Sequence, residues 1–337
     1  MSLLGVDDRR WLEFVEGRRD ATIFHHPAWA GLLADTYGYR AMAVTLTDGG
    51  AIAAGLPVIE VRRPIRGRRW VSLPFTDWCP ALAGGDRSVL VEELADIARS
   101  HGIPSVELRA PLPEGPSVRS ETVFVRHAMA LGPESVTGGS GLSTNHRRNL
   151  RAAERAGVRI VRGSSAADLE EFYRLCMLTR RRLGVPIQPR RFFRLLRERL
   201  LGTGLAFVVS AYSGDVAVAS AVFSAWNGTL VFKYGARDDR WARLGANHLL
   251  MWSAIRWAAE NGCHTVDLGR SALGQPELRR FKSGWGAREE PLAYTWIGNA
   301  PRPGGSRPFE AALAVLIRNS SPWVCRAMGE LFYRYAA

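Results

Sequence analysis

Residues 265–286 read TVDLGRSALGQPELRRFKSGWG and contain the two features that decide the fold. Thr265-Val266-Asp267-Leu268-Gly269 is typical of a buried strand, and we expect this strand to end in a turn at Gly269-Arg270. Phe281-Lys282-Ser283-Gly284-Trp285-Gly286 places one lysine between an aromatic residue and two glycines. Glycine permits positive φ and a close approach of the backbone, so we expect a loop that wraps a ligand while Lys282 meets its negative charge.

The composition around this stretch is that of a soluble globular protein with room for two domains. The chain has 337 residues, of which 47% are apolar and 23% charged. Its formal net charge is +13, carried almost wholly by arginine, since Lys233 and Lys282 are the only lysines. Such an excess favours polyanionic partners: nucleic acid, phosphorylated metabolites or anionic lipid head groups.

Cysteine usage and the absence of targeting patterns predict a cytoplasmic protein or one peripheral to a membrane. The four cysteines lie far apart without metal-ligand spacing, which predicts reduced and mostly buried thiols. The start of the chain lacks the pattern of a signal peptide, and no apolar run reaches membrane-spanning length. We expect no metal.

The order of predicted elements is similar in the two halves of the chain. The first half contains, in order, helices within 9–40, a hairpin of 41–46 and 51–61, strand 70–74, helix 88–101, and strands 105–109 and 123–130. The second half contains helix 147–156, strand 158–162, helices 166–183 and 189–201, strands 205–212, 216–226 and 229–234, helix 246–261, and strands 265–268 and 292–297. Two copies of one α/β unit, joined by a Gly/Ser/Thr-rich linker over 132–144, explain this order.

The last stretch, 308–335, is predicted to be helical and broken into two by Ser320-Ser321-Pro322. Apolar residues and arginines alternate along it. Two interpretations follow: helices docked on the body of the protein, or an interfacial membrane helix.

Two basic groups are candidates for anion binding. Arg147 and Arg148 fall in the first turn of a helix, with Ser143 or Thr144 as N-cap, where backbone N–H groups and guanidiniums could hold a phosphate together. A second group begins with Arg180 and Arg181 and continues with Arg190, Arg194 and Arg197. Helical spacing puts the last three on one face, and the group could follow a nucleic-acid backbone. A solvated basic face is the competing interpretation for both groups.

The junction from Lys233-Tyr234-Gly235 to Gly245-Ala246-Asn247 is where acetyltransferase-like folds hold a pyrophosphate. Neither alignment of Gly245 with the acyl-CoA signature succeeds, because the other required positions hold Arg243 or Ala242. In the first half, Asp77 lies among aromatic residues, where its carboxylate could orient or deprotonate an amine, or could simply cap a turn. His25 and His26 fit cap or core positions better than catalysis.

Together these motifs resemble the Fem family (FemABX) of aminoacyl-tRNA-dependent transferases. The matching segments are Phe24–Trp29, His146–Val158, Lys233–Asn247, Val266–Gly269 and Phe281–Gly286, and the resemblance covers most of residues 20–297. It implies an α/β (α+β) fold of two tandem GNAT domains, each a mixed, mostly antiparallel sheet flanked by helices. We expect domains at 1–135 and 136–300, with C-terminal helices at 301–337 packing on the body.

The resemblance also implies roles for individual residues. Lys282 would stabilise developing negative charge near the tRNA 3′ end, and Asp77 would serve as the second catalytic residue. Arg148, with Arg147, would bind a phosphate of the acceptor, and Tyr234 would line the acceptor channel with Asp77. The remaining motif residues, Lys233, Phe281 and Trp285, are assigned to substrate binding. The arginines from Arg180 to Arg197 would contact tRNA.

Three functions follow in order of preference. The first is transfer of an amino acid from aminoacyl-tRNA, a co-substrate and not a cofactor, to an amine in a peptidoglycan precursor or natural-product intermediate. A helical-hairpin insertion found in some bridge-forming members is missing, which leaves the acceptor open. The second is a GNAT-type N-acyltransferase that uses acyl-CoA or acyl-carrier protein. The third is a non-catalytic polyanion-binding protein.

Overall fold

The computed structural model describes residues 1–63, 67–84, 87–113, 115, 117–132, 141–299 and 307–336. The chain forms two compact units, each described here by itself. Unit 1 comprises Met1–Val125 with Pro291–Pro303, and unit 2 comprises Arg126–Glu290 with Gly304–Ala336. The expected domain boundary after residue 135, and most of the expected linker, fall on 133–140, which lie outside the described residues.

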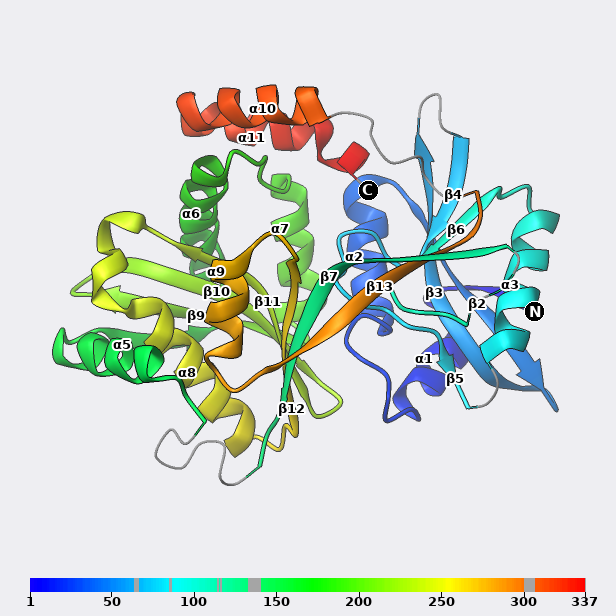
Figure 1. Cartoon of the computed structure of the whole chain (residues 1–337), viewed down its shortest axis with the longest axis horizontal. Coiled ribbons are helices and arrows are strands. Elements are labelled where there is room, and N and C mark those ends of the chain that lie inside the picture. Colours follow the sequence, from blue (N-terminus) through cyan, green and yellow to red (C-terminus); the bar gives the residue numbers. More distant parts are fainter. Residues whose placement is uncertain are drawn as a thin grey trace. The chain divides into compact units, whose positions relative to one another are not determined.

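Unit 1 consists of strands with helices packed on them (Figure 1). Its elements are β1 Ser2–Gly5, α1 Arg9–Glu16, α2 Pro27–Tyr37, β2 Arg40–Asp48, β3 Ala51–Arg63, β4 Gly67–Val71, β5 Leu82–Ala83, α3 Arg87–Ser100 and β6 Ser105–Leu108, followed by parts of β7 Val118–Ala130 and β13 Arg288–Gly298. The strand order is β1-β2-β3-β4-β6-β13, with β5 paired to β3. All these pairs are antiparallel except β4 with β6.

Local sequence signals explain the best-predicted elements of unit 1. The β2–β3 hairpin turns at Gly49 and Gly50, whose φ angles of 57° and 86° suit a tight turn between twisted strands. Helix α2 starts at Pro27, with the His26 side chain accepting from the Ala28 N–H, and ends at Gly38 in the left-handed region. Its predicted cap residues are confirmed, including the interpretation of His26 as a cap.

Unit 2 contains the stretch quoted first. Its elements are α5 Thr144–Arg155, β8 Arg159–Gly163, α6 Ala166–Leu183, α7 Arg190–Leu196, the π-helical turn η1 Arg197–Leu201, β9 Ala206–Ser213, β10 Val216–Trp226, β11 Thr229–Arg237, the 3-10 turn η2 Asp239–Leu244, α8 Ala246–Glu260, β12 Thr265–Ala272, α9 Pro276–Ser283, α10 Arg307–Asn319, α11 Pro322–Phe332 and the 3-10 turn η3 Tyr333–Ala336. The strand order is β7-β12-β11-β10-β9-β8, in which β11 and β12 run parallel.

The core of unit 2 lies between this sheet and α5 and α8. Helix α8 packs on β8 to β11, and α6 packs on β9 to β11, so that helices cover both faces of the sheet (Figure 1). Buried Phe223, Ile255 and Val266 belong to one apolar cluster, which also holds Trp285. The expectation of a mostly antiparallel sheet flanked by helices is confirmed.

Two segments differ from the sequence-based expectation. The residues before Ser283 form α9, so Phe281 and Lys282 lie in a helix and not in a loop; Pro276 at its first turn starts the helix. Strand β12 does not end at Gly269-Arg270 but continues to Ala272, with Gly269 at a φ of 71° inside it. The expected strand 292–297 is present within β13, where it pairs with β6 in unit 1.

The cysteines and the C-terminal helices are also placed. Cys79, Cys176 and Cys325 are buried, Cys263 is half-buried, and all four are free thiols, as expected. Helices α10 and α11, separated at Ser320-Ser321-Pro322, pack against α6. No described helix combines the length and apolar character needed to cross a membrane.

Candidate active site

The parallel strands β11 and β12 pair along only part of their length. Their register runs from Thr229 opposite Thr265 to Val231 opposite Asp267, and beyond these residues the two strands no longer pair. Both continue, β11 to Arg237 and β12 to Ala272. Because the strands are parallel, their carboxyl ends, which no longer pair with each other, lie at the same edge, which is where α/β proteins commonly bind ligands.

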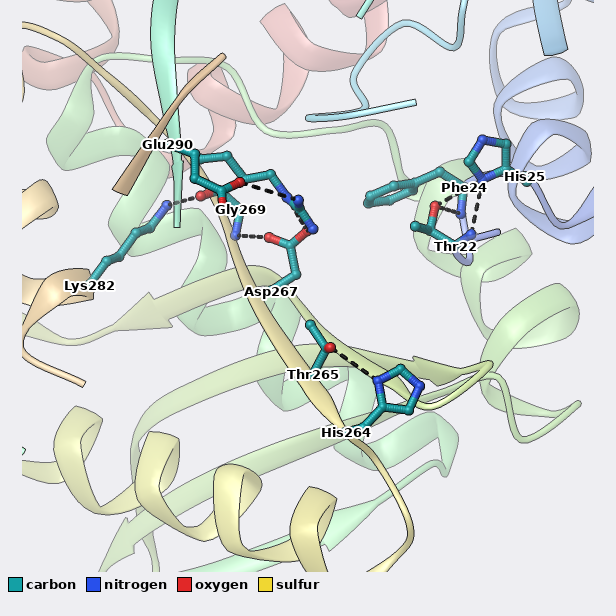
Figure 2. Close-up of polar contacts among 10 residues, drawn as sticks. Thr22, Phe24, His25, His264, Thr265, Asp267, Gly269, Lys282 and Glu290 are labelled. Atoms are coloured by element: carbon teal, nitrogen blue, oxygen red, sulfur yellow. Dashed lines mark hydrogen bonds and ion pairs between the residues drawn. The ribbon is translucent and has the colours of Figure 1, made fainter. Parts of the chain in front are cut away.

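Lys282 reaches this edge from α9. Its Nζ donates to the Gly269 carbonyl oxygen at 3.1 Å (Figure 2). It also donates to the Arg270 carbonyl oxygen at 2.7 Å, and the residue is 3% exposed. Both carbonyls follow Asp267, the last residue of β12 that pairs with β11. The ammonium group is therefore held where the strands separate, on a helix instead of the expected mobile loop.

Asp267, Arg126 and His127 support this strand end and were missed by sequence reasoning. The buried Asp267 carboxylate accepts from Arg126 Nε at 2.8 Å and from the Gly269 N–H at 2.7 Å (Figure 2). His127, fully buried on β7, has its Nε2 3.2 Å from Glu289. Burial, with the charge of Lys282, lowers the pKa of His127. No local pattern marks these residues, because strand pairing brings them together.

The Arg-Arg-Asn segment and the Phe-Lys-Ser-Gly-Trp-Gly segment are in direct contact. The Ser143 N–H donates to the Gly284 carbonyl at 2.9 Å, and His146 Nε2 donates to the Phe281 carbonyl at 2.8 Å. The His146 ring also meets the buried Trp285 ring edge-on, with centroids 4.4 Å apart. Burial lowers the pKa of His146, so its ring is neutral at pH 7. The first turn of α5 is thus attached to α9.

Replacing Gly284 with alanine is expected to destabilise unit 2 by about 1–3 kcal/mol, because an added methyl overpacks a filled site. A Cβ at Gly284 would lie 2.6 Å from His146 Cε1, although the φ of −62° is itself allowed for alanine. Thermal or urea unfolding measures the change. Gly274→Ala is the matched control, since a Cβ there meets nothing within 4 Å. Equal unfolding midpoints for the two variants would contradict the assigned contact.

Arg147 and Arg148 point outward from the α5 first turn. Ser143 is the N-cap, one of the two residues predicted for this role, and its side chain accepts from the His146 N–H. Both arginines are exposed; Arg148 Nη2 donates to Asn145 Oδ1 at 2.9 Å, and Arg147 Nη2 lies 3.4 Å from Thr144 Oγ1. Their assignment to a phosphate stays a prediction.

Helix α5 packs against α8 close to the N-terminus of α8, where an acyl-CoA pyrophosphate would be expected. Gly245 has a φ of 70°, and a Cβ there would lie 2.4 Å from the Asn149 carbonyl oxygen. Asn149 Nδ2 lies 3.4 Å from His248 Nε2, and burial lowers the pKa of His248 to about 4. A cavity of about 70 Å³ adjoins this turn, lined by Gly245, His248 and Phe281 among others. Only glycine therefore fits at position 245 between α5 and α8.

The predicted tRNA-binding arginines divide into two environments. Arg180 and Arg181 are half-buried at the end of α6, where Arg180 is close to Tyr234 and Tyr333. The other three are exposed and line one surface cavity of about 470 Å³ beside Tyr173. They are Arg190, Arg194 and Arg197. The predicted common face of these three is confirmed; contact with tRNA stays a prediction.

Tyr234 and Lys233 lie on the part of β11 that still pairs with β10 but no longer with β12, and both are half-buried. The Tyr234 ring meets Phe192 edge-on at 5.9 Å, and Lys233 Nζ lies 5.5 Å from the centre of the Tyr234 ring. The assignment of Tyr234 and Lys233 to substrate binding stays a prediction.

Asp77 belongs to unit 1, in a strained loop between β4 and β5. Leu73 and Phe75 have φ angles of 62° and 60°, unusual for residues other than glycine. Buried Arg109 donates to the Thr76 carbonyl at 2.6 Å. The half-buried Asp77 accepts a hydrogen bond from the Tyr294 hydroxyl at its backbone carbonyl, at 3.0 Å. The sequence does not reveal this strain, and a catalytic role for Asp77 stays a prediction.

Comparisons with known proteins support the fold. Residues 140–283 match the family model described as an acetyltransferase (GNAT) domain. A search of curated protein sequences gives no match. A crystal structure of FemX is similar with a TM-score of 0.68 and 12% identity, covering 93% of this chain and 100% of FemX.

Two further solved structures show the same architecture. The C-terminal domain of a putative lysylphosphatidylglycerol synthetase from Agrobacterium fabrum has a TM-score of 0.58 and 15% identity, with 91% and 93% of the two chains covered. A tandem GNAT protein from the clavulanic acid biosynthesis pathway has a TM-score of 0.53 and 11% identity, with 89% and 99% covered. The chain therefore has a Fem-like tandem GNAT fold, with an acetyltransferase (GNAT) domain in its second half.

Proposed function

We propose that this protein is an aminoacyl-tRNA-dependent transferase that joins an amino acid to an amine acceptor through an amide bond. The observation that carries the proposal is the missing acyl-CoA signature around Gly245, at the N-terminus of α8, where Ala242 and Arg243 stand at positions that the signature needs. A GNAT domain that keeps a lysine at its strand edge but lacks this signature is expected to use a donor other than CoA. An ester donor such as aminoacyl-tRNA satisfies this requirement.

The reaction begins with attack of the acceptor amine on the ester carbonyl carbon of aminoacyl-tRNA. The C–N bond forms, and the carbonyl oxygen becomes an oxyanion that the Lys282 ammonium stabilises. The C–O bond to the ribose then breaks, and the proton lost by the amine ends on the released tRNA hydroxyl. In this proposal Asp77 orients or deprotonates the amine.

The two other substrate contacts of the proposal are electrostatic. Arg148 and Arg147 bind a phosphate of the acceptor at the α5 N-terminus, where the exposed guanidiniums lie beside the free N–H groups of the first turn. Arg190, Arg194 and Arg197 contact the tRNA backbone from one exposed face. The acceptor is a peptidoglycan precursor, a natural-product intermediate or a lipid-linked amine that carries phosphate.

The test incubates the purified protein with mixed radiolabelled aminoacyl-tRNAs and candidate amine acceptors, with labelled acetyl-CoA in a parallel reaction. The expected result is label on the acceptor in the tRNA reaction only, abolished by prior ribonuclease treatment. Fractionating the tRNAs then names the amino acid.

Two outcomes would overturn the proposal. Transfer from the CoA thioester alone would make the protein a GNAT-type N-acyltransferase, despite the missing acyl-CoA signature. Binding of tRNA without transfer from either donor would favour a non-catalytic polyanion-binding protein.

A further inference from the structure

Helices α10 and α11 carry several large apolar side chains that are exposed. On α10, Val315 is 56% and Leu316 50% exposed; on α11 and its end, Trp323 is 71%, Leu331 62% and Phe332 46% exposed. Monomeric proteins seldom expose so many large apolar side chains on adjoining elements unless the surface binds something. We call these five residues the apolar face.

The opposite side of the same helices attaches them to unit 2. Ile317 and Cys325 are buried, and Arg318 Nη2 donates to the Leu183 carbonyl at 3.2 Å. A Cβ at Gly329 would lie 1.8 Å from the Ile187 carbonyl oxygen, so only glycine lets α11 approach this closely. Figure 1 shows both helices lying over α6. The two interpretations of this segment, docked helices or an interfacial helix, are therefore compatible with each other.

The charge around the apolar face is one-sided. From Ala311 to Arg334 the sequence has three cations, Arg318, Arg326 and Arg334, and one carboxylate, Glu330. All three arginines are exposed, including Arg318, which also donates to the Leu183 carbonyl. Glu330 Oε1 accepts from the Arg190 backbone N–H at 2.8 Å. That contact also places α11 beside the exposed arginines at the start of α7. An occupant of this surface must therefore be apolar where it meets Trp323 and negatively charged around it.

We propose that the apolar face docks on an anionic lipid bilayer. Tryptophan and leucine side chains would enter the boundary between head groups and acyl chains, while the arginines contact the negative head groups. A second copy of the chain fits less well, because a symmetric contact would place arginines against arginines. The interaction is independent of the proposed transfer reaction and needs no membrane-spanning segment.

The test measures sedimentation of the full chain with vesicles of phosphatidylcholine and phosphatidylglycerol, or of phosphatidylcholine alone. The wild type is expected to bind the anionic vesicles and to be released by salt. A variant with Trp323→Ser and Leu331→Ser is expected to bind at least about tenfold more weakly, because it loses the apolar contact. The matched control combines Val216→Ser and Leu273→Ser, which are both 46% exposed on other parts of unit 2.

The substituted residues are exposed, so circular dichroism and thermal unfolding are expected to match the wild type. Three outcomes would overturn the proposal: no binding to anionic vesicles at low salt, equal loss in the control variant, or equal binding to neutral vesicles. Sedimentation velocity provides a fourth. A wild-type dimer that the Trp323 and Leu331 substitutions dissociate would assign the face to a second copy of the chain.

Discussion

Replacing Lys282 with methionine is expected to lower kcat for aminoacyl transfer by about 10²–10³, with little change in KM. Methionine keeps most of the apolar stem but removes the ammonium that the Gly269 and Arg270 carbonyls hold at the end of β12. An interaction made with the oxyanion exists only in the transition state, so its loss changes the rate and not substrate binding. Steady-state transfer of label at varied acceptor concentration measures both constants.

The control for this variant is Arg280→Ala, which removes an exposed cation from the same helix and is expected to leave kcat nearly unchanged. Lys282→Arg keeps the charge and should retain part of the rate. Because Lys282 also ties α9 to β12, thermal unfolding of each variant is measured in parallel. A fall in rate that only follows the folded fraction would make Lys282 a structural residue and refute its catalytic role.

The elements that the sequence predicts well are those whose signals are local. The bounds of α6 and β10 agree with the predicted ranges, since α6 begins with a capping box at Ser165 and Asp168 and ends at a left-handed Gly184. Helix α9 was missed because its eight residues are too few to show a helical period, and two nearby glycines suggest a loop. The pairing of β13 with β6 is a contact across most of the chain, which no local pattern specifies.

In the candidate site, too, the features with local sequence signals are predictable and those formed by contacts between distant residues are not. Its motif residues, Lys282, His146 and Trp285, are recognisable because their neighbours in sequence are unusual, and the structure brings the two motifs into contact. The residues that hold these motif residues in place cannot be recognised from the sequence. Arg126 and Asp267 meet only after β7 and β12 have taken their places in unit 2, and the strained φ angles around Asp77 arise from packing. Chemistry-bearing motifs are therefore predictable here, whereas the network that orients them is not.

Replacing Asp267 with alanine is expected to lower the free energy of unfolding by about 3–5 kcal/mol, because it breaks a buried ion pair from one side. The Asp267 side chain is 5% exposed and its Oδ2 lies 2.8 Å from Arg126 Nη2, whose side chain is 17% exposed. Urea unfolding measures the loss. The matched control is Glu290→Gln: this carboxylate is 58% exposed and 3.9 Å from the same arginine, so its removal should cost under about 1 kcal/mol.

The variant Asp267→Asn distinguishes the role of Asp267 in positioning Lys282 from its contribution to the free energy of unfolding. Asparagine keeps the Oδ1 atom that accepts a hydrogen bond from the Gly269 N–H. This hydrogen bond holds Gly269 at its positive φ, and so it directs the Gly269 and Arg270 carbonyls to Lys282. Among molecules that remain folded, this variant is expected to transfer faster than Asp267→Ala, because only the alanine variant releases the strand end that positions the ammonium. Equal rates per folded molecule would show that the carboxylate stabilises unit 2 without orienting Lys282.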